Sequence, residues 1–144
     1  MRLQLVNTAS GRARLVRIFI VDDSATARAA FKAVLEQRPE WVVVGEALDG
    51  HHALATFHLH TPHLTLMDFI MPKMNGLEAA RHLTQRHSGA LILMVTTDPS
   101  KKLELEARRA GIKGLCGKYE MASLLEAVET VMNGGTYFSE TAAA

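Results

Sequence analysis

The sequence contains a single cysteine, Cys116, among its 144 residues. One thiol can neither close an internal disulfide nor build a cysteine-based zinc site, so a disulfide-stapled scaffold is excluded and a reducing, cytoplasmic setting is expected. Long apolar runs are also missing, because the stretch from Leu15 to Val21 is interrupted by Arg17 and ends at Asp22. A membrane-spanning helix needs about 18 consecutive apolar residues, so we expect neither a membrane span nor a signal peptide.

Proline is sparse, with four residues, and glycine is no more than ordinary, with ten, while 48% of the residues are hydrophobic. This composition excludes intrinsically disordered and collagen-like chains. The length corresponds to a single domain built around one core. The sequence therefore predicts one globular unit.

Clustered positive charge is missing from most of the chain. Four of the 16 basic residues precede the first acid, Asp22, which leaves twelve basic residues against 15 acidic ones in the remainder. Nucleic acid binding depends on many clustered cations, so we expect no direct nucleic acid binding by this chain. The arginine-rich start is interpreted as a solvated N-terminal extension over residues 1–16.

Short apolar runs alternate with longer stretches in which apolar residues recur at helical spacing. The runs predict five strands, at residues 17–21, 41–47, 64–67, 90–95 and 112–117, each followed by one helix. Five strands alternating with five helices predict an α/β fold with a doubly wound parallel sheet. Ligands of such sheets bind outside the carboxyl ends of the strands, so polar residues at those ends are the candidates for a site.

Three carboxylates follow two of the predicted strands, Asp22 and Asp23 after the first and Asp68 after the third. Carboxylates brought together repel one another unless a cation neutralises them, and Mg²⁺ is the simplest such cation. Thr96 and Lys118 end the fourth and fifth strands, where they would contact phosphoryl oxygens while Asp68 attacks phosphorus. These residues predict a magnesium site at which an aspartyl phosphate forms.

Four segments carry a family resemblance, and in chain order they read IFIVDDS, LTLMDFIMPKMNG, LILMVTT and GIKGLCGKYE. Through them the chain resembles the receiver domain of bacterial two-component response regulators. The closing GGTYFSE is similar to the end of LuxR/NarL-type receivers. The resemblance implies a receiver domain over residues 17–138, followed by a tail or truncated linker over residues 139–144. It also implies a flavodoxin-like sheet with strand order 2-1-3-4-5 and five helices.

The resemblance further implies roles for the acidic residues. Asp68 matches the phosphoacceptor, and Asp22 and Asp23 match the acidic pair that binds Mg²⁺ together with Asp68. Ile70 matches the position whose backbone carbonyl reaches the metal.

The resemblance also covers the other strand ends, where Thr96 matches the switch hydroxyl and Lys118 the lysine that contacts phosphate.

Three positions depart from the family pattern. Leu115 stands where an aromatic residue is usual, so the usual threonine–aromatic rotamer switch is not expected. Thr97 is bulkier than the usual small residue and is expected to alter phosphoryl exchange. Tyr119 follows the lysine where many relatives have proline.

The predicted function is a cytoplasmic, Mg²⁺-dependent phosphoacceptor switch that takes phosphate from a sensor histidine kinase or a phosphotransfer protein onto Asp68. We expect it to regulate a partner protein, a second copy in a homodimer, or a DNA-binding domain absent from this chain. It would be no enzyme beyond its own phosphorylation and dephosphorylation, and we expect no membrane partner.

Two alternatives remain open. Leu115 and Thr97 would also fit a pseudo-receiver, an interaction module that no longer cycles phosphate. A true enzyme on the same fold, such as a phosphatase or a flavin protein, is disfavoured because no phosphate-cradling glycine-rich loop follows the first strand.

Histidines are frequent, and five of the seven lie between His51 and His63. No two of them stand four residues apart on one predicted helix, which is the spacing of a helical metal site. We interpret them as part of a solvated helix face.

Overall fold

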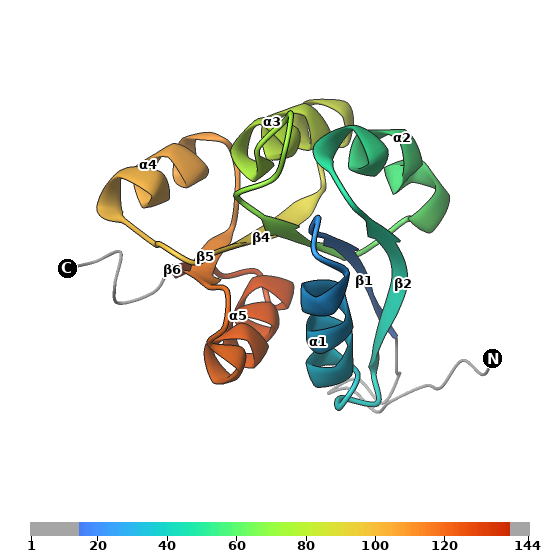
Figure 1. The fold of residues 1–144 in the computed structure, drawn as a ribbon. Helices are drawn as coiled ribbons and strands as arrows, with labels where there is room; N and C mark the ends of the chain where they lie inside the picture. The colour runs from blue at the N-terminus through green and yellow to red at the C-terminus, as the bar shows by residue number, and fades with distance from the viewer. Residues whose placement is uncertain (1–14, 139–144) are drawn as a thin grey trace.

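The computed structural model describes residues 15–138. Its strands are β1 (Val16–Val21), β2 (Trp41–Ala47), β3 (Leu64–Asp68), β4 (Leu91–Thr96), β5 (Gly114–Gly117) and β6 (Tyr137–Phe138). Its helices are α1 (Ala25–Leu35), α2 (Gly50–His60), α3 (Gly76–Arg86), α4 (Lys101–Arg109) and α5 (Met121–Met132). The sheet lies between two helical layers, with α2, α3 and α4 on one face and α1 and α5 on the other (Figure 1). All but two residues of the predicted extension 1–16, and the whole tail 139–144, lie outside the described residues.

The sheet contains six parallel strands in the order β2-β1-β3-β4-β5-β6. The predicted α/β class and the order of the first five strands are confirmed. The prediction of only five strands was incomplete, because β6 has two residues and is too short to show strand periodicity. β6 can approach β5 because Gly114 has no side chain: a Cβ atom there would lie 2.7 Å from the carbonyl oxygen of Tyr137.

The strand β5 is shorter than predicted and begins at Gly114 instead of Ile112. The Ile112 N–H donates to the Ala107 carbonyl at 3.0 Å, so this residue closes the end of α4. Gly111, with a φ of 86°, makes the left-handed turn that this helix ending requires.

Side-chain hydrogen bonds fix the start of four helices. The capping residues are Ser24, Asp49, Asn75 and Ser100. At α1 the Ser24 hydroxyl accepts from the Ala27 N–H at 3.1 Å, so serine caps this helix. The carboxylates of Asp22 and Asp23 are therefore not used as the cap of α1.

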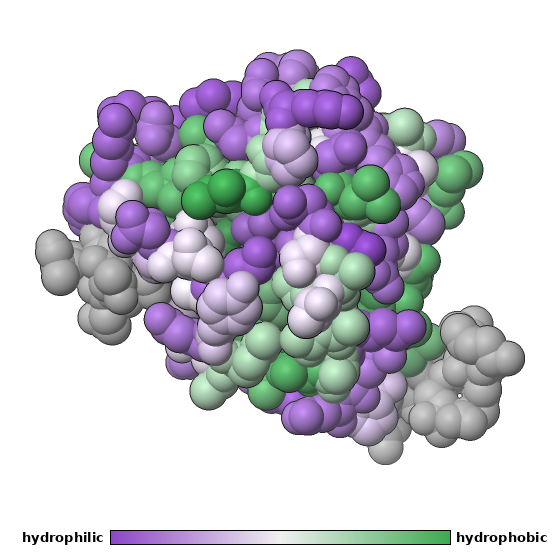
Figure 2. Space-filling view, in the orientation of Figure 1, coloured by the Kyte–Doolittle hydropathy of each residue, from purple (hydrophilic) through white to green (hydrophobic). Residues whose placement is uncertain are grey.

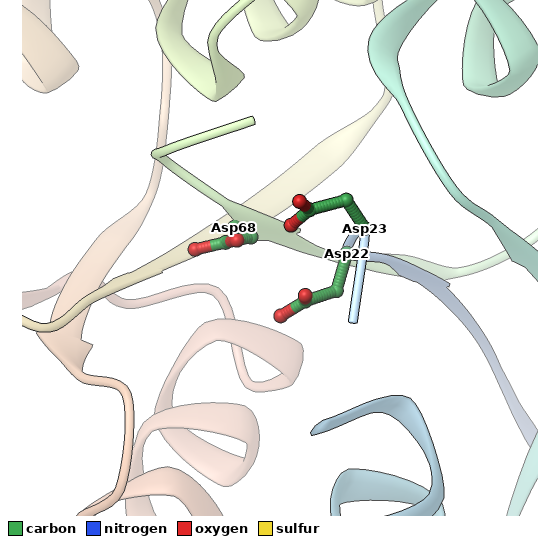
Figure 3. A group of neighbouring side chains, drawn as sticks. All are labelled: Asp22, Asp23 and Asp68. Carbon is green, nitrogen blue, oxygen red and sulfur yellow. The ribbon is translucent and has the colours of Figure 1, made fainter. Parts of the chain in front are cut away.

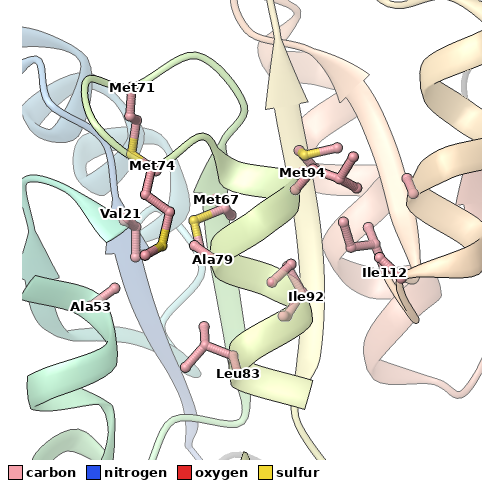
Figure 4. Close-up of a cluster of buried hydrophobic side chains, with 14 of the residues drawn as sticks. Val21, Ala53, Met67, Met71, Met74, Ala79, Leu83, Ile92, Met94 and Ile112 are labelled. Carbon is pink, nitrogen blue, oxygen red and sulfur yellow. The ribbon is translucent and has the colours of Figure 1, made fainter. Parts of the chain in front are cut away.

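Apolar side chains fill both interfaces between the sheet and its helices. The cluster under α2, α3 and α4 contains several methionines, among them Met67, Met71, Met74 and Met94 (Figure 4). The cluster under α1 and α5 is mainly aliphatic and includes Cys116. A fully buried large side chain stabilises the fold by about 1.5–3 kcal/mol, so the two clusters hold the strands, and hence the strand ends, in a fixed arrangement.

On the face shown in Figure 2, hydrophilic residues surround several separate apolar patches. The most exposed large apolar side chains are Leu48, Leu59, Ile70, Leu105 and Tyr119. Within residues 15–138, no helix combines the length and apolar character needed to cross a membrane.

The interpretation of the histidines as a solvated helix face is correct for His51 and His58, which are exposed, but wrong for two others. The His60 ring lies 4.9 Å from the Phe19 ring, measured between centroids. His63 Nδ1 accepts from the backbone N–H of Arg17 at 2.8 Å. These histidines therefore pack α2 and the following loop against the sheet.

Candidate functional site

Three carboxylates meet at the carboxyl edge of the sheet. Strands β1 and β3 are parallel neighbours with Val21 opposite Met67, so Asp22 and Asp68 follow at the same level. One oxygen from each of Asp22, Asp23 and Asp68 lies within 4.8 Å of the others (Figure 3). Asp22 and Asp68 are buried, with 0% and 3% exposure, whereas Asp23 is exposed. The structure thus places together the three acids that the sequence singled out.

Asp22 is held by contacts on both its main chain and its side chain. Its N–H donates to the Ala47 carbonyl at 3.0 Å, and its Oδ1 accepts from the Ser24 N–H at 2.8 Å. Its Oδ2 is buried and pairs with Lys118 Nζ at 2.9 Å. A carboxylate oxygen has two lone pairs, so Oδ2 can bind a cation while it stays paired with Lys118.

Lys118 brings an ammonium group to this cluster from the end of β5. Its Nζ lies 2.9 Å from Asp22 Oδ2 and 3.2 Å from Asp68 Oδ2. Its backbone N–H donates to the Thr96 carbonyl at 2.8 Å, which fixes the base of the side chain. Burial alone would lower the pKa of the Lys118 amine, but contact with the charges of Asp22 and Asp68 outweighs burial and raises the pKa. Lys118 is therefore charged and shared between two acids.

The pKa of Asp68 is raised to about 6. Burial is the main cause, and the negative charge of Asp22 adds to it. Lys118 opposes this rise without cancelling it, and Asp23 contributes a smaller repulsion. With one ammonium against three carboxylates, the cluster keeps an excess of negative charge when all three acids are ionised.

Thr96 ends β4 and is 1% exposed. Its hydroxyl oxygen accepts from the backbone N–H of Asp98 at 3.3 Å, and within residues 15–138 the hydroxyl makes no other hydrogen bond, so it can donate to a ligand. An open depression of about 260 Å³ borders Thr96 and is lined by the loops after β3 and β4 together with α4. The depression therefore reaches Thr96, while the three acids and Lys118 do not line it.

The loop after Asp68 is fixed by a close main-chain contact. The Gly76 N–H donates to the Phe69 carbonyl at 2.7 Å, and a Cβ at position 76 would lie 2.2 Å from the Asp68 carbonyl oxygen. Glycine is required here because any larger residue would displace the main chain of Asp68. Ile70 lies in this loop with its side chain 60% exposed, and its predicted carbonyl contact to a metal stays a prediction.

The three positions that depart from the family pattern differ in their exposure. Leu115 is fully buried in the cluster under α2, α3 and α4, and pairs with Phe138 of β6. Thr97 is exposed, and so is Tyr119, with 69% exposure, directly after Lys118. An aromatic residue therefore lies next to Leu115 in space, but it comes from β6.

Two residues of the site were not found from the sequence, Arg28 of α1 and Glu46 of β2. Arg28 Nη1 donates to the Asp22 carbonyl at 2.6 Å, and Arg28 Nε pairs with Glu46 Oε1 at 2.9 Å. Neither residue ends a strand, so a prediction based on polar residues at strand ends does not include them.

The site fits a hard divalent cation, on the evidence of its donor set. Three carboxylates converge, two of them are buried, and within the described residues the single ammonium that pairs with them does not balance their charge. Such cations prefer oxygen ligands and favour the ionised form of the carboxylates that bind them.

Comparisons with known proteins agree with this geometry. The response regulator receiver domain family matches residues 18–129. The transcriptional regulatory protein DegU of Brevibacillus brevis is 33% identical over 123 residues, which are 85% of this chain and 52% of DegU. The chemotaxis protein CheY of Bacillus subtilis is 33% identical over 118 residues, which are 81% of this chain and 98% of CheY. The chain thus spans about half the length of DegU and nearly all of CheY.

Solved structures give the same result. A LuxR-family two-component response regulator from Aurantimonas sp. SI85-9A1 superposes with a TM-score of 0.86 at 33% identity, covering 90% of this chain and 93% of that one. The signal receiver domain of NarL from Mycobacterium tuberculosis superposes with a TM-score of 0.78 at 26% identity, covering 84% and 98%. The resemblance predicted from four sequence segments is confirmed, and the chain belongs to the response regulator receiver domain family of two-component systems.

Proposed function

We propose that this chain is a phosphoacceptor switch in which Asp68 receives the phosphoryl group of a phosphohistidine on a sensor kinase or a phosphotransfer protein. The observation that carries the proposal is the position of Asp68, buried beside Asp22 and Asp23 and 3.2 Å from the Lys118 ammonium. A carboxylate nucleophile needs a fixed position and a neighbouring positive charge to attack a phosphoryl group. Asp68 has both.

In the proposed transfer, an Asp68 carboxylate oxygen attacks phosphorus in line with the departing nitrogen. An O–P bond forms and the P–N bond of the donor breaks. The electron pair of that bond returns to the donor imidazole, which takes up one proton from solvent. Asp68 must be ionised to attack, so a pKa of about 6 leaves it competent near neutral pH.

The residues that would hold Mg²⁺ are Asp22, Asp23 and Asp68, with the carbonyl of Ile70 as a further ligand. When bound, the cation offsets negative charge on the carboxylates and on the transferring phosphoryl oxygens. Lys118 stabilises one phosphoryl oxygen with its ammonium, and the Thr96 hydroxyl donates a hydrogen bond to another.

The added charge is the proposed signal. A phosphoryl group brings about −1.5 to −2 charge to the rim, which draws Thr96 and Lys118 inward and biases the face formed by α4, β5 and α5. The partner that reads this face is a second protein, a second copy in a homodimer, or a DNA-binding domain outside this chain. We place the switch in the cytoplasm, bound to no membrane and to no nucleic acid through this chain, and catalysing only its own phosphorylation and dephosphorylation.

Intact-mass analysis after incubation with acetyl phosphate and Mg²⁺ tests the proposal. We expect the wild type to gain one phosphoryl group, Asp68→Asn to gain none, and a chelator to suppress the gain. Asp49→Asn is the matched control, because asparagine caps α2 as well as aspartate does and the residue lies outside the acidic cluster.

The alternative function is a pseudo-receiver that binds partners without cycling phosphate. Its support is Leu115, which is fully buried and aliphatic where the family usually has an aromatic switch residue. A wild type that stays unmodified under excess donor and Mg²⁺, while remaining folded, would favour this alternative over the phosphoacceptor.

A further inference from the structure

The two neighbouring acids share one peptide unit, the one that joins Asp22 to Asp23. The N–H of Asp22, which belongs to the preceding peptide unit, donates to the Ala47 carbonyl at 3.0 Å. The Asp22 carbonyl, which forms part of the shared peptide, accepts from Arg28 Nη1 at 2.6 Å. Arg28 thus contacts this peptide unit from the side of α1.

Arg28 is itself fixed by a second contact. Its Nε pairs with Glu46 Oε1 at 2.9 Å, and its side chain is only 15% exposed. The guanidinium is planar and presents separate N–H groups in a rigid fork, so it can bind a carbonyl and a carboxylate at once. One side chain thus fastens α1 to the end of β1 and to the edge strand β2.

Asp23 depends on this arrangement more than its neighbours do. Asp22 and Asp68 are buried and contact Lys118, whereas Asp23 is exposed and its carboxylate makes no hydrogen bond within the part of the chain that is described. Its position follows from the peptide that precedes it. If that peptide rotated, the Asp23 carboxylate would leave the group of three oxygens that lie within 4.8 Å of one another.

We propose that Arg28 is a positioning residue for the divalent-cation site: it holds the Asp22–Asp23 peptide so that both carboxylates face Asp68. The inference rests on the proposed cation site and assigns Arg28 no contact with the cation or with phosphate. Glu46 supports it by holding the guanidinium in place.

A positioning role and a purely electrostatic role predict opposite changes in Mg²⁺ affinity when Arg28 is removed. Arg28 is a cation close to an acidic site, so its charge alone disfavours a second cation. If only this charge mattered, removing Arg28 would tighten Mg²⁺ binding. If Arg28 orients the peptide, its removal weakens binding, because groups that orient metal ligands affect metal affinity by about 10–100-fold.

Isothermal titration of the full chain with Mg²⁺, without any phosphodonor, distinguishes the two roles. We expect Arg28→Met to raise the Kd about tenfold. Arg28→Lys should give an intermediate Kd, because a lysine retains the charge but lacks the fork that reaches both acceptors. The matched control is Lys32→Met, one turn further along α1, where the side chain is exposed and the Kd should stay within about twofold.

Circular dichroism melting of each variant separates loss of folding from loss of positioning, and Arg28→Lys serves if Arg28→Met does not fold. A Kd for either Arg28 variant equal to or tighter than that of the wild type, with Mg²⁺ still bound by the wild type, would overturn the role of Arg28 alone. A wild type that binds no Mg²⁺ would overturn the cation site itself, and the Arg28 inference with it.

Discussion

Two clusters of acids and cations, each containing a buried carboxylate, differ in charge balance. At the strand ends, Lys118 is the only cation within residues 15–138 that pairs with the carboxylates of Asp22 and Asp68, and Asp23 lies beside them. On α4, Glu104 is 5% exposed and is paired with Arg108, whose Nε and Nη2 both lie 2.9 Å from Glu104 Oε2. The first cluster contains more acids than cations. In the second cluster the Glu104 carboxylate is paired with the Arg108 guanidinium.

The balanced cluster has a structural explanation. The Arg108 guanidinium carbon lies 3.9 Å from the centre of the Phe138 ring, and Lys101 Nζ lies 3.9 Å from Glu104 Oε1. These contacts tie α4 to β6 and neutralise the buried carboxylate. Among the described residues the unbalanced cluster has no such full pairing, and this difference supports the proposal that it binds an external cation.

The largest expected effect comes from removing Lys118, the ammonium that pairs with two carboxylates of the unbalanced cluster. Lys118→Met leaves Asp22 and Asp68 buried and facing each other, which should lower the free energy of unfolding by about 3 kcal/mol. Urea unfolding near neutral pH, without divalent cations, measures the change. Lys113→Met, which removes an exposed lysine just before β5, should change it by less than about 0.5 kcal/mol. Equal losses in the two variants would contradict the ion-pair geometry.

A second prediction concerns the pH dependence of stability. Burial and the charge of Asp22 raise the pKa of Asp68 from 3.8 to about 6, so ionisation of Asp68 opposes folding. The free-energy cost grows as the pH rises from the pKa of the unfolded chain through the folded pKa of about 6. Asp68→Asn removes the cost and should be more stable than the wild type at alkaline pH by about 2–3 kcal/mol.

Urea unfolding of both proteins across this range measures the effect. The advantage of Asp68→Asn should shrink by about 1–2 kcal/mol between roughly pH 8 and roughly pH 5. An advantage that grows as the pH falls would mean that the pKa of Asp68 is depressed, contrary to the structure.

The smallest of these effects is expected at the balanced cluster. Arg108→Met leaves Glu104 without its closest cation and removes the contact with Phe138, so the free energy of unfolding should fall by about 1–2 kcal/mol. Arg109→Met, at the neighbouring exposed position, is the control and should stay within about 0.5 kcal/mol of the wild type. Phosphorylation with acetyl phosphate should persist in both variants, and its loss in Arg108→Met alone would give this cluster more than a structural role.

The sequence predicted the fold class and the acidic cluster for the same physical reason. Parallel strands end at one edge of a sheet, so residues such as Asp22 and Asp68, far apart in the chain, must lie close together. Apolar strand runs were enough to locate those ends to within two residues.

What the sequence did not predict depends on contacts that have no local pattern. β6 pairs with β5 through two residues, and its approach relies on Gly114. Arg28 reaches back from α1 to a main-chain carbonyl, and helical periodicity does not report where a long side chain ends. His60 was assigned to solvent because its ring contact with Phe19 is a tertiary contact.

The most direct test of the central claim is the carboxyl pKa of Asp68, followed by carbon NMR with and without Mg²⁺. The excess of acids over cations at the strand ends predicts a pKa of about 6 in metal-free protein and a clear fall on addition of Mg²⁺, because the cation favours the ionised form. A pKa that is the same in both conditions, up to millimolar Mg²⁺, would contradict the claim that these three acids form a divalent-cation site.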